Sequence, residues 1–155
     1  MLEIFVDADG CPVKQETYKV AERYALRVKL VANSWMRTPP FEWLELVIVR
    51  DLFDAADDWI VEHVTADDIV ISGDIILASR CLPKGAHVLS PRGGTFDEAD
   101  IGAALANREL YSHLRDLGTI TKGPAPFDQR DRSRYLQRLD QVIQSIRRQQ
   151  QRDGR

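Results

Sequence analysis

The chain has 155 residues, of which 44% are hydrophobic and 29% are charged, as is typical of one globular domain with its own core. No apolar stretch approaches the roughly 20 residues that a membrane-spanning helix needs, so we expect no membrane partner. The two cysteines form no CxxC pair, and the N-terminus lacks the features of a signal peptide. The expected location is therefore the reducing cytoplasm.

Charge is unevenly distributed along the chain. Residues 1–121 contain 12 Lys/Arg and 20 Asp/Glu, whereas residues 122–155 contain 9 Lys/Arg and 4 Asp. An acidic body with a basic C-terminal segment suits a metal-dependent enzyme that acts on a polyanion. The solvent-facing side of an Arg-rich helix explains the same segment, because charged helix faces are common.

Short apolar runs alternate with helical patterns. The expected strands cover residues 2–6, 27–33, 46–50, 69–72 and 87–89. The expected helices cover residues 12–26, 55–63, 75–81, 101–115 and a final amphipathic segment with Leu136, Leu139, Ile143 and Ile146 inward. This alternation predicts right-handed crossovers and a single three-layer α/β domain over residues 1–148, with a mostly parallel sheet flanked by helices. Residues 149–155 are expected to be a frayed tail.

Aspartates follow several of the expected strands. Asp7 and Asp9 follow the first, Asp74 follows the fourth, and Asp54 and Asp57 open the helix after the third. The carboxyl ends of parallel strands share one edge, where open α/β folds place their sites. Carboxylates gathered there repel one another unless protons or a cation neutralise them. The sequence therefore predicts a Mg²⁺ or Mn²⁺ site at this edge, with these five residues as ligands.

Ordinary structural roles also explain some of these residues. Asp54 is a suitable helix cap, Asp9 before Gly10 is a good turn residue, and Asp57 is compatible with solvated surface charge. Asp7 and Asp74 are harder to explain in this way, because an ionisable group that directly ends an apolar strand is costly without a partner.

The segment Asp7-Ala8-Asp9-Gly10 also resembles the start of haloacid-dehalogenase-type phosphatases. In that interpretation Asp7 is the nucleophile and Asp9 the general acid. Such enzymes also need a Ser or Thr after a later strand, which Ser72 supplies, and a Lys. Lys84 is a poor candidate, because it sits in a Pro-Lys-Gly turn, so the match is partial.

Several segments together are typical of one protein family. They are residues 7–14, 30–33, 54–60, 73–78, 92–93 and 122–124, with Phe127 and Asp131-Arg132. In this combination, over residues 1–147, the chain resembles the YaiI/YqxD family of small bacterial proteins.

The resemblance implies a PIN-like fold, similar to the PIN and NYN nuclease domains. Those domains carry an Asp at the end of the first strand, an acidic residue on a helix before the fourth, and a Ser-Gly-Asp or Ser/Thr-x-Asp after it. Asp7 matches the first, Asp54 or Asp57 the second, and Ser72-Gly73-Asp74 the third. NYN-type sites often carry another Asp two residues later. This chain has Ile76 there, which implies one metal ion instead of two, or lost catalysis.

Basic residues and one asparagine near these motifs are candidates for contact with a nucleic-acid backbone, with Phe127 or Tyr135 offering a stacking face. The candidate residues are Lys14, Asn33, Arg92, Lys122, Arg130 and Arg132.

The leading hypothesis is a Mg²⁺- or Mn²⁺-dependent ribonuclease-like phosphodiesterase that binds RNA and uses Asp7, Asp9, Asp57 and Asp74 in catalysis. Two alternatives stay open: a phosphatase with Asp7 as nucleophile, and a noncatalytic RNA- or nucleotide-binding module. A homodimer is compatible with the sequence, because PIN-like domains often pair.

Overall fold

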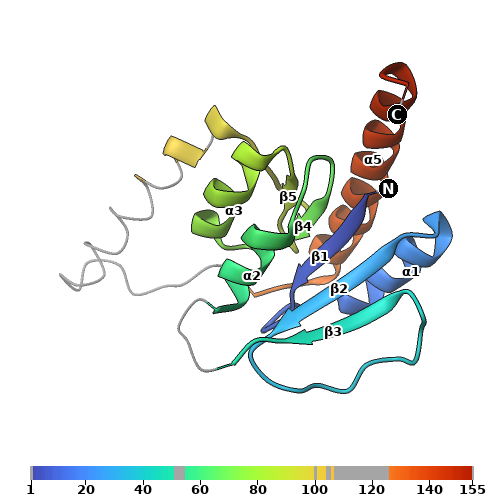
Figure 1. Ribbon diagram of the computed structural model, residues 1–155, viewed down its shortest axis with the longest axis vertical. Helices are drawn as coiled ribbons and strands as arrows, with labels where there is room; N and C mark the ends of the chain where they lie inside the picture. The colour runs from blue at the N-terminus through green and yellow to red at the C-terminus, as the bar shows by residue number, and fades with distance from the viewer. Residues whose placement is uncertain (1, 51–54, 100, 104–105, 107–125, 155) are drawn as a thin grey trace.

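The computed structural model describes residues 2–50, 55–99, 101–103, 106 and 126–154 (Figure 1). Within these residues six strands form one sheet in the order β3-β2-β1-β4-β5-β6. All neighbouring strands pair in parallel except β5 and β6, which are antiparallel. The strands are β1 (Glu3–Asp7), β2 (Arg27–Ala32), β3 (Leu44–Ile48), β4 (Ile69–Ile71), β5 (His87–Leu89) and β6 (Thr95–Phe96).

Helices cover both faces of the sheet, which gives a single three-layer α/β domain. In Figure 1, α1 and α5 lie on one side, and α2 and α3 lie on the other. The helices are α1 (Lys14–Tyr24), α2 (Ala55–His63), α3 (Ile75–Cys81), the 3₁₀ turn η1 (Leu82–Lys84) and α5 (Gln129–Arg152). No helix in the described part of the chain is long and apolar enough to cross a membrane.

The alternation of side chains along β1 supplies a core on each face. Ile4 and Val6 pack in the cluster that also contains Leu139 and Ile143 of α5. Phe5 points the other way, into the cluster that contains Ile60 of α2. Successive strand residues face opposite sides of a sheet, so a strand covered on both faces needs an almost continuous apolar run. Burying each such side chain stabilises the fold by about 1.5–3 kcal/mol.

The direction of winding changes between β1 and β4. From β1 the chain moves through α1 to β2 on one side, whereas from β4 it moves through α3 to β5 on the other. Because β1 and β4 are paired neighbours, their carboxyl ends form the topological switch point of the sheet. Open α/β sheets bind ligands at such points.

Several element bounds differ from those that the sequence predicts. The third strand lies two residues earlier, because its pairing with β2 runs from Leu44 to Ile48 and does not follow the apolar run to its end. The short strand β6 was not expected; it returns from the turn that contains Gly93 and Gly94 to pair with β5. The last helix continues to Arg152, beyond the expected end at residue 148. Most of the helix expected at 101–115 lies outside the described residues.

Candidate functional site

Asp7 and Ser72 meet at the carboxyl ends of β1 and β4. The Ser72 hydroxyl donates a hydrogen bond of 3.0 Å to Oδ2 of Asp7. The same hydroxyl oxygen accepts the backbone N–H of Asp74 at 3.0 Å. Ser72 is buried, so this hydroxyl is a fixed link between the first strand and the turn into α3.

Asp74 is the N-cap of α3. Its Oδ1 accepts the backbone N–H groups of Ile76 at 2.8 Å and Leu77 at 3.4 Å. A cap of this kind satisfies N–H groups that the first turn of a helix leaves unpaired. Ile76, the position where the PIN-like resemblance predicts an acid, is 48% exposed and contributes its backbone N–H to Asp74.

Asp9 lies in the turn that follows β1 and joins the ends of two neighbouring strands. Its Oδ2 accepts the backbone N–H of Asn33 at 2.9 Å. Gly10 then turns the chain with a φ of +75°, a backbone conformation that favours glycine. The predicted turn role of Asp9 is therefore present, together with its position at the carboxyl edge.

The three carboxylates are electrostatically coupled. Burial raises the pKa of the Asp7 carboxyl above its usual value, and the hydrogen bond from Ser72 partly offsets this rise. The charges of Asp74 and Asp9 raise the pKa of Asp7 further. A cation beside Asp7 would relieve the repulsion among these carboxylates.

Asp57 lies beside α3. It belongs to the first turn of α2, and its charge contributes to the raised pKa of Cys81, about 11, which is mainly an effect of burial. Its neighbour Asp58 forms an ion pair of 2.8 Å with Arg80, also on α3. Asp54, the other acidic candidate on this segment, lies outside the described residues.

The carboxylates are not arranged as a ready-made metal cage. Among the described residues, no group of three or more His, Cys, Asp or Glu side chains is placed so as to hold a metal ion. The structure brings Asp7, Asp9 and Asp74 to one edge, but the last two already accept backbone hydrogen bonds.

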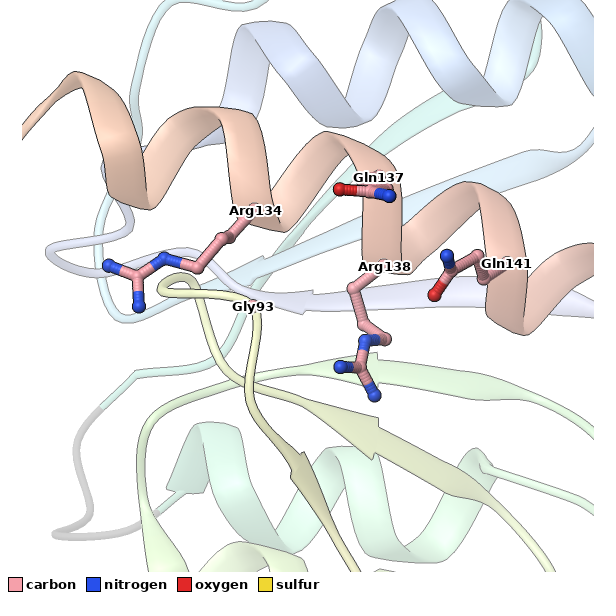
Figure 2. A pocket seen from close by; sticks show the side chains of 5 residues that line it. All are labelled: Gly93, Arg134, Gln137, Arg138 and Gln141. Carbon is pink, nitrogen blue, oxygen red and sulfur yellow. The ribbon is translucent and has the colours of Figure 1, made fainter.

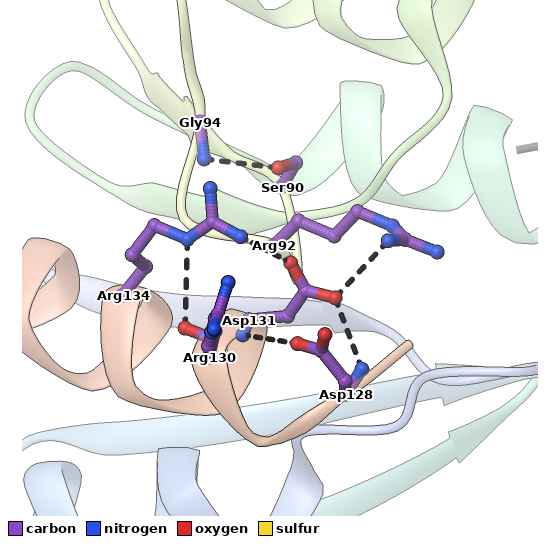
Figure 3. Close-up of polar contacts among 7 residues, drawn as sticks. All are labelled: Ser90, Arg92, Gly94, Asp128, Arg130, Asp131 and Arg134. Carbon is purple, nitrogen blue, oxygen red and sulfur yellow. Dashed lines mark hydrogen bonds and ion pairs between the residues drawn. The ribbon is translucent and has the colours of Figure 1, made fainter. Parts of the chain in front are cut away.

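A second cluster lies where the loop after β5 meets the start of α5, as Figure 3 shows. Asp131 is buried, and its two oxygens pair with Arg92 at 3.0 Å and Arg134 at 2.7 Å. Asp131 also forms a capping box with Asp128, in which each side chain accepts the other residue's backbone N–H at 3.0 Å. Asp131 therefore fixes both the first turn of α5 and its contact with the β5–β6 loop.

Phe127 lies close to two guanidinium groups. The guanidinium carbon of Arg92 is 5.8 Å from the ring centroid, and that of Arg132 is 4.9 Å from it. Arg132 also donates to the carbonyl of Pro12 at 2.8 Å and to Glu16 at 3.0 Å. Arg92 and Arg132, both expected to contact nucleic acid, are thus engaged within the fold. Each still keeps over a third of its side chain exposed.

The remaining nucleic-acid candidates have varied positions. Lys14 donates to the Cys11 carbonyl at 3.1 Å, and Asn33 is exposed at the end of β2. Arg130 is exposed on α5, and Lys122 lies outside the described residues. Tyr135 cannot provide a stacking face, because it is fully buried and its hydroxyl is 2.6 Å from that of Thr17.

Sequence reasoning missed the central role of Asp131. An Asp-x-x-Asp spacing ahead of an amphipathic helix, here Asp128 and Asp131, is close to the capping-box pattern and would have indicated the cap. The pairing with Arg92 has no local signal, because the two residues are 39 positions apart.

Comparisons with known proteins agree on one family. The sequence model of the family described as "Uncharacterized BCR, YaiI/YqxD family" matches residues 5–145. The chain is 56% identical over 152 residues to a UPF0178 protein of Rhodospirillum centenum, which covers 96% of this chain and 99% of that protein. It is 47% identical over 140 residues to a UPF0178 protein of Caulobacter vibrioides, covering 90% of this chain and 92% of that protein. No solved structure matches the chain.

Proposed function

The chain belongs to the YaiI/YqxD family, and we propose that it is a metal-dependent phosphodiesterase that acts on RNA. One observation carries this proposal: Asp7, Asp9 and Asp74 share the carboxyl edge at the switch point between β1 and β4. The burial of Asp7, its link to Ser72 and the charges around it are the properties expected of a functional carboxylate. The order Asp7, then Ser72-Gly73-Asp74, agrees with the PIN-type pattern.

The donor set suits Mg²⁺ or Mn²⁺ better than a metal that needs a closed cage. Mg²⁺ is usually held by one or two carboxylates, keeps several waters, and takes further ligands from substrate phosphates. Asp7 is the central candidate ligand. The negative charges of Asp74 and Asp9 repel its carboxylate, and a bound cation would relieve this repulsion. This explains why a functional metal site need not contain three preassembled side chains. Asp54 and Asp57 remain candidates for the ligand set or for catalysis.

The protein's own groups have distinct parts in this proposal. The metal ion would polarise the phosphate and lower the pKa of a bound water. Ser72 holds the Asp7 carboxylate in one orientation, so Asp7 does not have to be ordered when substrate binds. Asp74 holds the start of α3 through Oδ1, which accepts both capping bonds.

A metal-dependent cleavage assay tests the proposal. Purified protein is incubated with a fluorescently labelled RNA and Mn²⁺, Mg²⁺ or EDTA. We expect cleavage with a metal ion, none with EDTA, and a loss of at least about 100-fold in Asp7→Asn, because electrostatic groups of this kind contribute on that scale. The matched control is Glu45→Gln, since Glu45 is exposed on β3 and removed from the site. Equal cleavage by Asp7→Asn and by the wild type would refute the proposal.

A phosphatase is the second candidate, and the contact between Ser72 and Asp7 favours it too. A nucleophilic Asp7 would need a Ser at this position, and Asp9 two residues on as general acid. Lys84 does not complete that site, because it precedes β5 at the opposite edge of the sheet and donates to the Val61 carbonyl. Hydrolysis of a generic phosphomonoester with an acid-stable, base-labile phospho-aspartate at Asp7 would favour this candidate over the nuclease.

A further inference from the structure

Three arginines form a ridge on the exposed side of α5. Arg130, Arg134 and Arg138 recur every fourth residue, so they lie on one face of the helix, about 6 Å apart along its axis. Arg130 and Arg138 make no side-chain hydrogen bond or ion pair within the described part of the chain, and Arg134 keeps 64% of its side chain exposed while it pairs with Asp131. We call these three residues the arginine ridge.

Two neighbouring pockets follow this ridge and share Arg134. One, of ≈ 140 Å³, is lined by Gly93, Arg134, Gln137, Arg138 and Gln141. Figure 2 shows the side chains of Arg134 and Arg138 on either side of the loop that carries Gly93. The other, of ≈ 480 Å³, is lined by Gln129, Arg130, Ser133 and Arg134.

The chemistry of both pockets is that of an anion site. Each pocket has two guanidinium groups, together with amide or hydroxyl groups that donate hydrogen bonds. Neither has a carboxylate among its lining residues. Asp131 is buried beneath the ridge and is paired, whereas Asp140 points to Tyr24 and Arg23 on α1. Asp131 pairs with only one of the three arginines, so the ridge presents net positive charge on a chain with a formal net charge of −3.

The first turn of α5, where the ridge begins, contacts loops at the same edge of the sheet as the candidate active site. Arg132, near the start of α5, donates a hydrogen bond to the carbonyl of Pro12, which follows the Asp9-Gly10 turn. Asp131 ties the same turn to Arg92 in the loop after β5. In Figure 1, α5 runs from this edge back along the sheet. A polymer bound along the ridge would therefore reach the carboxyl edge of the sheet, where β1 and β4 end, at the N-terminal end of α5.

We propose that the arginine ridge binds the backbone of a single RNA strand, with successive phosphates in the two pockets. This inference rests on the proposed function and places its substrate. A single line of pockets, one helical turn apart, follows one backbone. An anionic membrane surface fits less well, because a membrane-bound helix inserts its apolar face, and here that face is buried through Tyr135, Leu139 and Ile143.

Binding of a fluorescein-labelled oligouridylate, followed by anisotropy in EDTA at several salt concentrations, tests the ridge without any cleavage. The triple variant Arg130→Gln/Arg134→Gln/Arg138→Gln is expected to bind at least about tenfold more weakly at low salt. The slope of log K against log salt should become shallower by about 1.4, because the two pockets hold two phosphates and each phosphate contact on a single strand contributes about 0.7. The control Lys19→Gln/Arg27→Gln/Arg37→Gln removes the same charge from exposed positions on other elements and is expected to bind nearly as the wild type.

A second variant separates binding from folding. Arg134 pairs with Asp131, so its loss can disturb α5, whereas Arg138→Glu breaks no side-chain hydrogen bond or ion pair of the described residues. Arg138→Glu is expected to weaken RNA binding and leave the circular dichroism spectrum and Tm unchanged.

Each result separates the ridge from the proposed catalysis. Binding through the ridge without any cleavage by the wild type would refute the phosphodiesterase and leave the ridge standing. Equal losses in the ridge and control variants would overturn the ridge, whatever the cleavage assay gives. So would a wild type that binds phosphatidylserine vesicles but not the oligouridylate.

Discussion

The hydroxyl of Ser72 donates a hydrogen bond of 3.0 Å to the carboxylate of Asp7, although the two residues are 65 positions apart in the chain. They meet because β1 and β4 are parallel neighbours that end at the same edge. Burial, Asp74 and Asp9 all raise the pKa of Asp7, whereas the hydrogen bond from Ser72 lowers it. The bond therefore stabilises the charged form of a carboxylate that its surroundings disfavour.

Removing the charge of Asp7 should stabilise the fold at neutral pH. The folded pKa of Asp7 lies above 3.8, the usual value for an aspartate, so the folded state binds the proton more tightly than the unfolded chain. By linkage, stability decreases as the pH rises from that value through the folded pKa. We expect Asp7→Asn to have a higher Tm than the wild type at pH 7, with a difference that shrinks below pH 3.8. Scanning calorimetry at both pH values measures this.

The matched control for this charge effect is Glu45→Gln, on the exposed surface of β3. Its Tm should stay close to that of the wild type at both pH values, because a fully hydrated carboxylate gains little from neutralisation. A lower Tm for Asp7→Asn at pH 7 would show that the charge of Asp7 already has a stabilising partner in the folded protein.

A bound cation should stabilise the wild type through the same carboxylates. A ligand that binds only the folded state adds about 2.7 kcal/mol at 100 times its Kd. We expect millimolar Mn²⁺ to raise the Tm of the wild type and to leave that of Asp7→Asn/Asp74→Asn unchanged, with saturable binding by calorimetry in the wild type alone. An equal rise in both proteins would show that the metal binds elsewhere.

Gly93 should be the least replaceable of the turn glycines. Its φ is +91°, and an added Cβ would lie 2.9 Å from the backbone carbonyl carbon of Arg134. Gly10 has a similar φ of +75°, but a Cβ there would meet nothing within 4 Å. Backbone strain alone costs about 1–3 kcal/mol, so Gly10→Ala measures that part and Gly93→Ala should cost clearly more. Urea denaturation of both variants gives the two free energies of unfolding, and equal losses would contradict the close approach of this loop to α5.

Replacing Asp131 should destabilise the start of α5 more than replacing its capping partner. Asp131→Ala removes a buried carboxylate from two arginines and one backbone N–H. Because Arg92 and Arg134 are partly exposed and can be hydrated, we expect a loss of about 2 kcal/mol, below the range for fully buried pairs. Asp128→Ala should cost about 1 kcal/mol, as for a lost N-cap. Equal free energies of unfolding for the two variants would show that the arginine pairs add nothing.

Local patterns account for much of the fold. The strands β1, β4 and β5 are recognisable from their short apolar runs. The helix α5 is recognisable because Leu139, Ile143 and Ile146 recur with the period of 3.6 residues. The bounds of β3 do not, because they depend on which residues of β2 pair with it. The pairing of β5 with β6 is also hard to predict, because these strands have only three and two residues and are joined by a turn.

The same division applies to the candidate site. The sequence itself places Asp7, Asp9 and Asp74 after apolar strands, because the order of residues along the chain puts a carboxylate at each strand end. Their meeting depends on the sheet order, in which β1 lies beside β4, and strand neighbours are chosen by long-range packing that no local pattern encodes. Tertiary contacts also decide which arginines form ion pairs. Arg92 and Arg132 pair with buried or half-buried acids, whereas Arg130 and Arg138 remain exposed. The physical reason is that an arginine's environment is set by the carboxylates that folding brings within reach, and those lie far away in the sequence.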